Sequence, residues 1–239
     1  MKTVKHRLEE NKSIYVLGDT HLEHPNTDLK KIQHHIDIIK QENTAWIHLG
    51  DWVDAITPLD KRYSITDKRS GVVEAFLHME ELFNPIASQC VTALRGNHES
   101  KWSRLEGDML EVICRRWNVP YLGYCGFVVI RTEKKNYKLW LHHGAGGGRK
   151  RGAKIIRLNE WSQFVDADIY LQGHTHTYVQ FTDEQVTATK KKARHYANIP
   201  GYISSYDGYD NYVEELGLPP QQTGMLQIYF DPIQIELIT

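Results

Sequence analysis

The side chains best suited to chemistry are two histidines that stand one residue apart at the end of an apolar segment. His174 and His176 follow Asp168-Ile169-Tyr170-Leu171, which has the composition of a short strand. In an open α/β sheet, ligands bind in the crevice at the carboxyl ends of the strands. Side chains one residue apart on an extended backbone point to the same side. The pair is therefore a candidate metal site, provided that other strand ends supply partners.

Four more apolar segments end in residues of the same kind. The segments are 14–17, 45–49, 90–94 and 137–142, and the first two stop directly at a glycine. In chain order they are followed by Asp19 with His21, Asp51 with Asp54, Asn97 with His98, and His143. A core strand gains nothing from a terminal carboxylate or imidazole, so one such residue is uninformative. Five strand ends that carry them predict a site at one edge of a sheet.

The donor set indicates which ligand this site binds. Carboxylate, amide and imidazole donors without a thiolate suit Mn²⁺, Fe, Zn²⁺ or Ni²⁺, and they argue against a structural zinc. Seven candidate ligands are too many for one ion but suit two ions that share a carboxylate. Two ions ~3.5–4 Å apart serve in-line displacement at phosphorus. We therefore expect two divalent metal ions, with Mn²⁺ as the first candidate.

The elements that position these residues change character along the chain. Apolar spacing predicts helices over 28–41, 72–83, 102–117 and 153–165, with a loop over 58–70. The first half alternates strands and helices, which is typical of a parallel sheet. The second half is rich in strands, expected at 126–132, 137–142, 167–172, 178–189, 193–198, 225–230 and 233–237. This pattern favours an α/β fold of two stacked sheets with helices outside.

Composition places the chain among ordinary soluble proteins. Its 239 residues are 41% hydrophobic and 25% charged, with a net charge of −1, so we expect one domain over 1–239. The charge gives no sign of a nucleic-acid or membrane partner, and no apolar run is long enough to span a membrane. Three cysteines without a C-x-x-C pair, and no signal peptide, favour a reducing, cytoplasmic location.

Taken together, the motifs resemble those of the calcineurin-like metallophosphoesterase superfamily. The resemblance covers residues 19–176 and follows the order of that family. The motifs are Asp19-x-His21, Gly50-Asp51-x-x-Asp54, Gly96-Asn97-His98-Glu99, His143-Gly144 and Gly173-His174-x-His176. The resemblance implies a four-layer α/β/β/α sandwich with a binuclear metal centre at one end.

The resemblance also implies a role for each residue. Asp19, His21 and His176 would hold the first metal; Asn97, His143 and His174 would hold the second; Asp51 would bridge them. A water or hydroxide between the ions would be the nucleophile. His98 would act as general acid at the leaving group, with Asp54 orienting it. The family places glycine after its ligand, so His143 is favoured over His142, and strand neighbours face opposite ways.

The substrate is less clear from the motifs. Two of them, Arg95 to Glu99 and Gly50 to Asp54, look closest to the protein serine/threonine phosphatases. That branch has an arginine after its second aspartate, where this chain has Ala55. The Gly-His-x-His form is more like the nuclease and phosphodiesterase branches. We therefore expect a phosphodiester, in DNA or a nucleotide, with a phosphomonoester as the alternative.

Two further segments offer substrate contacts. The glycine-rich basic loop 146–151 includes Arg149, which could contact a phosphate, although a solvated loop is equally compatible. The tyrosines at 202, 206, 209 and 212 could stack on bases, but packing is the simpler explanation. A non-catalytic interaction module with this fold is a third alternative. Such modules usually lose ligands, whereas all seven are present here.

Overall fold

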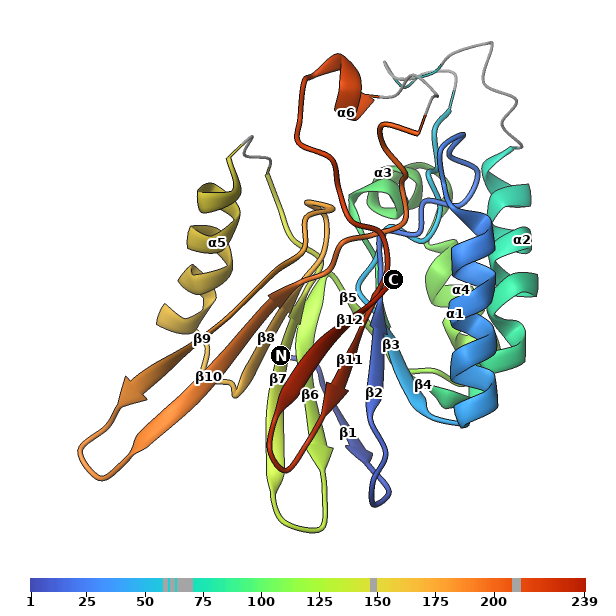
Figure 1. Ribbon diagram of the computed structural model, residues 1–239. Helices are drawn as coiled ribbons and strands as arrows, with labels where there is room; N and C mark the ends of the chain where they lie inside the picture. The colour runs from blue at the N-terminus through green and yellow to red at the C-terminus, as the bar shows by residue number, and fades with distance from the viewer. Residues whose placement is uncertain (58–59, 61–62, 64–70, 147–149, 208–211) are drawn as a thin grey trace.

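The structure is a computed structural model that describes residues 1–57, 60, 63, 71–146, 150–207 and 212–239. Most of the loop expected at 58–70, and Arg149, lie outside these residues. Two six-stranded sheets pack face to face, with helices on both outer sides (Figure 1). This arrangement confirms the predicted α/β sandwich of two stacked mixed sheets.

The first sheet carries three of the five predicted strand ends. Its order is β12-β11-β2-β3-β4-β5, and β2 to β5 run parallel while β11 and β12 form an antiparallel hairpin at one edge. The strands are β2 (Ile14–Leu17), β3 (Ala45–His48), β4 (Cys90–Leu94), β5 (Tyr121–Gly123), β11 (Met225–Tyr229) and β12 (Gln234–Ile238). Because β2, β3 and β4 are parallel, their carboxyl ends reach the same edge.

The second sheet carries the other two predicted strand ends. Its order is β1-β6-β7-β8-β10-β9, and β7 and β8 are parallel neighbours. The strands are β1 (Thr3–Arg7), β6 (Cys125–Arg131), β7 (Asn136–His142), β8 (Ile169–Gln172), β9 (Val179–Val186) and β10 (Lys191–Asn198). The ends of β7 and β8 therefore lie side by side.

Helices cover the outer face of each sheet. The first sheet is covered by α1 (Leu29–Glu42), α2 (Val72–Phe83) and α4 (Met109–Arg116), and the second by α5 (Arg151–Glu160) (Figure 1). Short 3₁₀ helices, Asn84–Gln89 and Trp161–Gln163, follow α2 and α5, and α6 (Tyr212–Glu215) is a single turn. No helix among the described residues is long and apolar enough to cross a bilayer.

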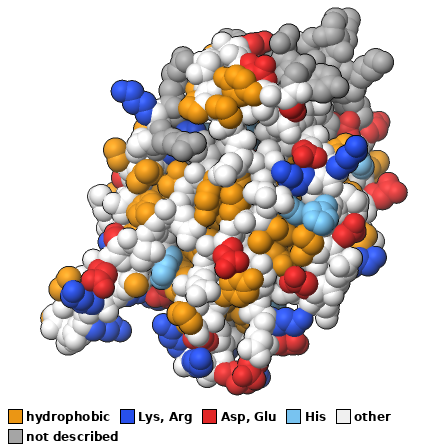
Figure 2. All heavy atoms as spheres, in the orientation of Figure 1, with side chains coloured by type: hydrophobic (Ala, Val, Ile, Leu, Met, Phe, Trp, Pro, Cys, Tyr) orange, Lys and Arg blue, Asp and Glu red, His pale blue; other side chains and the backbone are white. Residues whose placement is uncertain are grey.

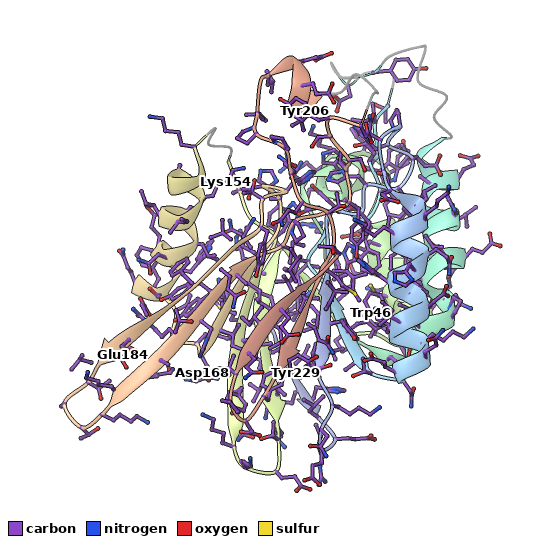
Figure 3. The ribbon with its side chains drawn as sticks, viewed as in Figure 1. Trp46, Lys154, Asp168, Glu184, Tyr206 and Tyr229 are labelled. Atoms are coloured by element: carbon purple, nitrogen blue, oxygen red, sulfur yellow. The ribbon has the colours of Figure 1, made fainter. Side chains whose placement is uncertain are left out.

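Alternating side chains of the buried strands divide the core into layers. Ile14 and Val16 of β2 face the other sheet, in a cluster that includes Leu139 of β7 and Ile169 of β8. Their neighbour Tyr15 faces the helices, in a cluster with Trp46 and the apolar stripe of α1 (Figure 3). Strands buried on both faces are expected to be continuous apolar runs, which is why these segments were recognisable. On the face shown in Figure 2, acidic and basic side chains are intermixed.

Three elements differ from the sequence prediction. The helix expected at 102–117 is two helices, α3 (Asn97–Glu106) and α4, because Gly107 has a φ of +95° and Asp108 caps the second helix through the N–H of Glu111. Strands β1 and β5 were not predicted, since the first is largely polar and the second has three residues. Early initiation of α3 places Asn97 and His98 in its first turn.

Candidate metal centre

The predicted site residues converge at one edge of the sandwich, where the ends of β2, β3, β4, β7 and β8 meet. Backbone hydrogen bonds tie the loops together in pairs. Asp19 N donates to Gly50 O at 2.8 Å, and His21 N donates to Asp51 O at 3.0 Å. Gly173 N donates to His143 O at 3.0 Å. The rigid strands beneath therefore fix the positions of the functional side chains.

One group of donor atoms comes from the loops after β2 and β8. Asp19, His21 and His176 are buried, and each offers a ligand atom within 4.8 Å of the other two. The Nε2 atoms of His21 and His176 lie 3.0 Å apart. The Oδ1 atom of Asp19 is buried and has no hydrogen-bond partner among the described residues. An unpartnered buried carboxylate oxygen facing two imidazoles fits a cation, which would compensate its desolvation.

A second group comes from the loops after β3, β4, β7 and β8. Ligand atoms of Asp51, His143 and His174 all lie within 4.8 Å of one another. The Nε2 atom of His143 is 3.3 Å from Asp51 Oδ2 and 3.1 Å from Asn97 Oδ1. The Nδ1 atom of His143 lies 2.8 Å from the carbonyl oxygen of Leu49, which must accept a hydrogen from it. This bond directs Nε2 into the site, where, against the effect of burial, the carboxylate of Asp51 raises the pKa of His143 to about 9, so an ion that binds there displaces a proton.

Asp51 lies between the two groups. Its Oδ2 atom is 3.3 Å from Nε2 of His143 and 3.6 Å from Nε2 of His21. Its Oδ1 atom accepts the backbone N–H of His98 at 3.0 Å. The carboxylate is thereby held in one orientation, with one oxygen facing both groups. This is the position that a carboxylate shared by two ions must occupy.

The protonation behaviour of the site fits cation binding. Burial raises the pKa of Asp19 well above its usual range, and the neighbouring Asp51 adds to this effect. Burial also acts to raise the pKa of Asp51, but His143 and His98 hold it well below the usual range. Burial lowers the pKa of His174 to about 4 and holds that of His176 well below its usual range, so both are neutral near pH 7. Neutral imidazole is the form that binds metal.

The backbone of the site is held in a sparsely populated conformation. Five of the predicted ligands have a positive φ: Asp19 (50°), His21 (42°), Asp51 (51°), His174 (71°) and His176 (48°). Such non-glycine residues each cost of order 1–3 kcal/mol and cluster at functional sites. The loops therefore give up stability in order to direct these side chains inward.

His98 and Asp54, for which the motifs predict an acid–base role, are in direct contact. The Nδ1 atom of His98 is 2.5 Å from the backbone oxygen of Asp54 and 3.1 Å from its Oδ1. The same Oδ1 lies 3.5 Å from Nδ1 of His21. His98 also offers a ligand atom within 4.8 Å of those of His21 and Asp51. Its fixed contact with Asp54 favours a role in proton transfer over one as a ligand.

The remaining candidates are placed as follows. His142 faces away from the site, with its ring 4.3 Å from that of Trp161, so the alternation along β7 selects His143. Tyr202 is buried and its hydroxyl contacts Nδ1 of His35 at 2.8 Å, which is a packing role. Tyr206 is exposed, whereas Tyr209 and the side chain of Tyr212 lie outside the described residues. Arg149 as a substrate contact stays a prediction.

Two buried residues support the site without having been assigned a part in it. His48 accepts the N–H of Gly50 at Nδ1, lies 3.3 Å from Thr20 Oγ1, and stacks on Trp52 with ring centroids 3.6 Å apart. Glu99 accepts three backbone N–H groups from the loops after β3 and β4. The position of Glu99, two residues after Asn97 in a recognised motif, was the available signal. For His48 the signal was its place in a buried strand.

Comparison with known proteins agrees with this geometry. The family model of the calcineurin-like phosphoesterases matches residues 12–178. No curated protein matches the chain significantly. Similar solved structures include Yfce, a phosphoesterase from E. coli (17% identity, TM-score 0.46, 95% of this chain and 100% of that chain). A Vps29 double mutant from Entamoeba histolytica is 12% identical, with a TM-score of 0.47 over 95% of this chain and 98% of that chain. A metallophosphoesterase from Sphaerobacter thermophilus is 14% identical, with a TM-score of 0.43 over 95% of this chain and 88% of that chain.

The family match covers most of the chain and includes every residue of the two donor groups, from Asp19 to His176. The chain belongs to the calcineurin-like phosphoesterase family.

Proposed function

We propose that this protein hydrolyses phosphate esters with a pair of divalent metal ions and that its substrates are phosphodiesters. The observation that carries the proposal is the position of Asp51, whose Oδ2 atom lies between the imidazoles of His21 and His143. One buried carboxylate that faces two separate donor groups is suited to two ions that share it.

The donor groups divide the ligands between the ions. Asp19, His21 and His176 would hold the first ion, Asn97, His143 and His174 the second, and Asp51 both. When bound, the ions would supply positive charge at the phosphate and lower the pKa of water towards neutrality. Carboxylate, amide and imidazole donors make Mn²⁺ the first candidate, with Fe, Zn²⁺ and Ni²⁺ as alternatives.

His98 would supply the proton that the leaving group needs. Its Nδ1 atom is engaged by the backbone oxygen and carboxylate of Asp54, so Nε2 is the ring atom that can protonate the leaving oxygen. The contact with Asp54 fixes the orientation of the ring.

The preference for a diester rests on Ala55. A phosphomonoester dianion has more charge at phosphorus than a diester, and an arginine after the second aspartate would compensate it. Ala55 is buried in the apolar cluster below the site, and residues 50–57 contain no basic side chain. A described cation, Lys154, approaches from α5 and donates to the backbone oxygen of Thr175 at 3.2 Å (Figure 3). A diester in DNA or a nucleotide fits this charge balance best.

The test compares two esters with the same leaving group. The metal-free protein is assayed with and without Mn²⁺ on bis-p-nitrophenyl phosphate and on p-nitrophenyl phosphate. We expect Mn²⁺-dependent hydrolysis with the higher kcat/KM for the diester. Asp51→Asn should lower it by at least about 10³-fold, since the shared carboxylate supports several kcal/mol of charge stabilisation. The control Asp37→Asn, at an exposed position of α1, should retain full activity.

Two outcomes contradict the proposal. Hydrolysis that persists in Asp51→Asn would exclude the two-ion arrangement. A higher kcat/KM for the monoester would keep the hydrolase and exclude the diester preference.

A further inference from the structure

Glu99 is the buried acidic residue that the donor groups leave without a role. It lies in the first turn of α3 and is 1% exposed. Its Oε2 atom accepts the N–H of Gly96 at 2.7 Å and that of Asp51 at 3.0 Å. Its Oε1 atom accepts the N–H of Val53 at 3.1 Å. The bond to Gly96 is an ordinary helix cap, but the other two bonds reach a different loop.

Neighbouring loops of the site are connected by two different kinds of hydrogen bond. The loops after β2 and β3 are joined by backbone bonds, among them Asp19 N to Gly50 O and Leu22 N to Trp52 O. In the described part of the chain, no bond between backbone atoms joins residues 50–54 to residues 95–99. Hydrogen bonds that involve side chains connect these two loops instead, and the Glu99 carboxylate accepts two of them, from Asp51 N and Val53 N. The spacing between Asp51 and Asn97 therefore depends on this carboxylate.

We propose that Glu99 is a positioning residue that sets the second ion position by fixing the loop of Asp51 relative to the loop of Asn97. The inference rests on the proposed metal centre. The first donor group does not need this connection. Asp19, His21 and His176 belong to the loops after β2 and β8, and the shared Asp51 stays tied to the loop after β2 by the bond from His21 N to Asp51 O. Loss of Glu99 should therefore weaken one ion and spare the other.

The hydrogen-bond pattern explains why neither close analogue can replace Glu99. Both of its oxygens accept hydrogen bonds: Oε2 accepts two N–H groups and Oε1 accepts the third. Glutamine has one oxygen and one NH₂ group, so at least one N–H would face another donor. Aspartate keeps both oxygens but is one methylene shorter, so it cannot reach the loop of Asp51 from the same backbone.

The experiment titrates the metal-free full-length protein with Mn²⁺ by calorimetry. We expect two ions in the wild type. In Glu99→Gln the second ion should bind about 10–100-fold more weakly, as is usual when a partner of a ligand is lost, while the first keeps its affinity. Adding His176→Ala to Glu99→Gln should abolish the remaining tight ion. Glu111→Gln, the same change at a surface ion pair with Arg115, should bind both ions normally.

The outcomes separate this inference from the proposed function. A wild type that does not bind two Mn²⁺ ions contradicts the metal centre itself. If the wild type binds two and Glu99→Gln also binds two with unchanged affinities, the positioning role is excluded. Equal weakening of both ions would show a general structural role and also overturn the inference. Circular dichroism checks folding, and if Glu99→Gln does not fold, the same titration of Glu99→Asp decides by the same criteria.

Discussion

The backbone N–H of His174 donates to Oδ2 of Asp19 at 2.7 Å and so joins the loop after β8 to the loop after β2. The bond fixes one oxygen of the carboxylate and leaves Oδ1 buried without a hydrogen bond to any described residue. Asp51 is held in the same manner, with Oδ1 bonded to the N–H of His98 and Oδ2 facing the site. Both carboxylates are therefore oriented by the backbone before any ion binds.

This preorganisation predicts strong stabilisation by divalent ions. An unpartnered buried carboxylate oxygen is costly, and an ion that binds only the folded state removes that cost. At 100 times the dissociation constant, each ion should raise the free energy of unfolding by ~2.7 kcal/mol. For a chain of this size that corresponds to about 5–10 °C in Tm. Scanning calorimetry of the EDTA-treated protein with and without Mn²⁺ measures the shift.

Asp19→Asn serves as the test variant for this effect and Asp37→Asn as its control. The first should lose about half of the Mn²⁺-induced shift, because the neutral amide binds the first of the two ions poorly, and the second should keep the whole shift. A wild-type Tm that is the same with EDTA and with Mn²⁺ would contradict the prediction.

Gly96 is predicted to be irreplaceable for a steric reason. A Cβ atom on Gly96 would lie 1.9 Å from Oδ1 and 2.5 Å from the backbone nitrogen of Asp51. Gly96→Ala should therefore displace the loop of Asp51, cost about 1–3 kcal/mol of stability as overpacking does, and weaken Mn²⁺ binding. Urea unfolding and Mn²⁺ titration measure the two effects.

Gly152→Ala is the matched control for this substitution. A Cβ atom on Gly152 would have no neighbour within 4 Å, and the residue lies inside α5. We expect alanine there to raise stability by about 0.5–1 kcal/mol and to leave the metal centre unchanged. Normal ion binding by Gly96→Ala would show that the loop tolerates the methyl group.

The strand ends and the polar side chains that converge there were predictable because two independent signals coincide. An apolar run such as Ile14 to Leu17 is recognisable when the strand is buried on both faces, and the polar residues after it have no use in a core. The pairing of His21 with His176, 155 residues apart, followed from the motif order and is now a 3.0 Å contact.

The features that were not predicted depend on long-range contacts or on local backbone geometry. The polar strand β1 exists because it pairs with β6, and no periodicity in Thr3–Arg7 reveals that partner. The break between α3 and α4 depends on the φ of +95° at Gly107, within a segment whose apolar spacing is continuous. Glu99 and His48 act through backbone groups of distant loops, so their residue types alone did not indicate their partners.

His98 is predicted to matter in proportion to the basicity of the leaving group. General acid catalysis contributes about 10²–10⁴-fold when the leaving oxygen needs a proton. His98→Ala should therefore lower the kcat/KM for an alkyl phosphodiester by that factor and lower it much less for a p-nitrophenyl ester, whose anion leaves unaided. A plot of log kcat/KM against leaving-group pKa should be steeper for the variant. A uniform loss across the series would instead assign His98 to substrate binding.

His35 predicts how stability depends on pH away from the metal centre. This imidazole is fully buried between α1 and Tyr202, and burial lowers its pKa from 6.5 to about 4. Between these values the unfolded chain binds a proton that the folded chain does not, so stability falls as pH decreases from 6.5 towards 4. At pH 5 this residue should cost about 2 kcal/mol relative to pH 7.5, at 1.36 kcal/mol per pH unit below 6.5.

The measurement is urea unfolding of the EDTA-treated protein at pH 7.5 and pH 5. His35→Gln keeps a polar partner for the hydroxyl of Tyr202 and cannot bind the extra proton. The variant should therefore lose about 2 kcal/mol less than the wild type between the two pH values. The control His78→Gln, at a half-exposed position of α2 that pairs with Glu23, leaves His35 intact and should follow the wild type. Equal losses in His35→Gln and the wild type would mean that His35 takes up a proton as readily in the folded protein as in the unfolded chain.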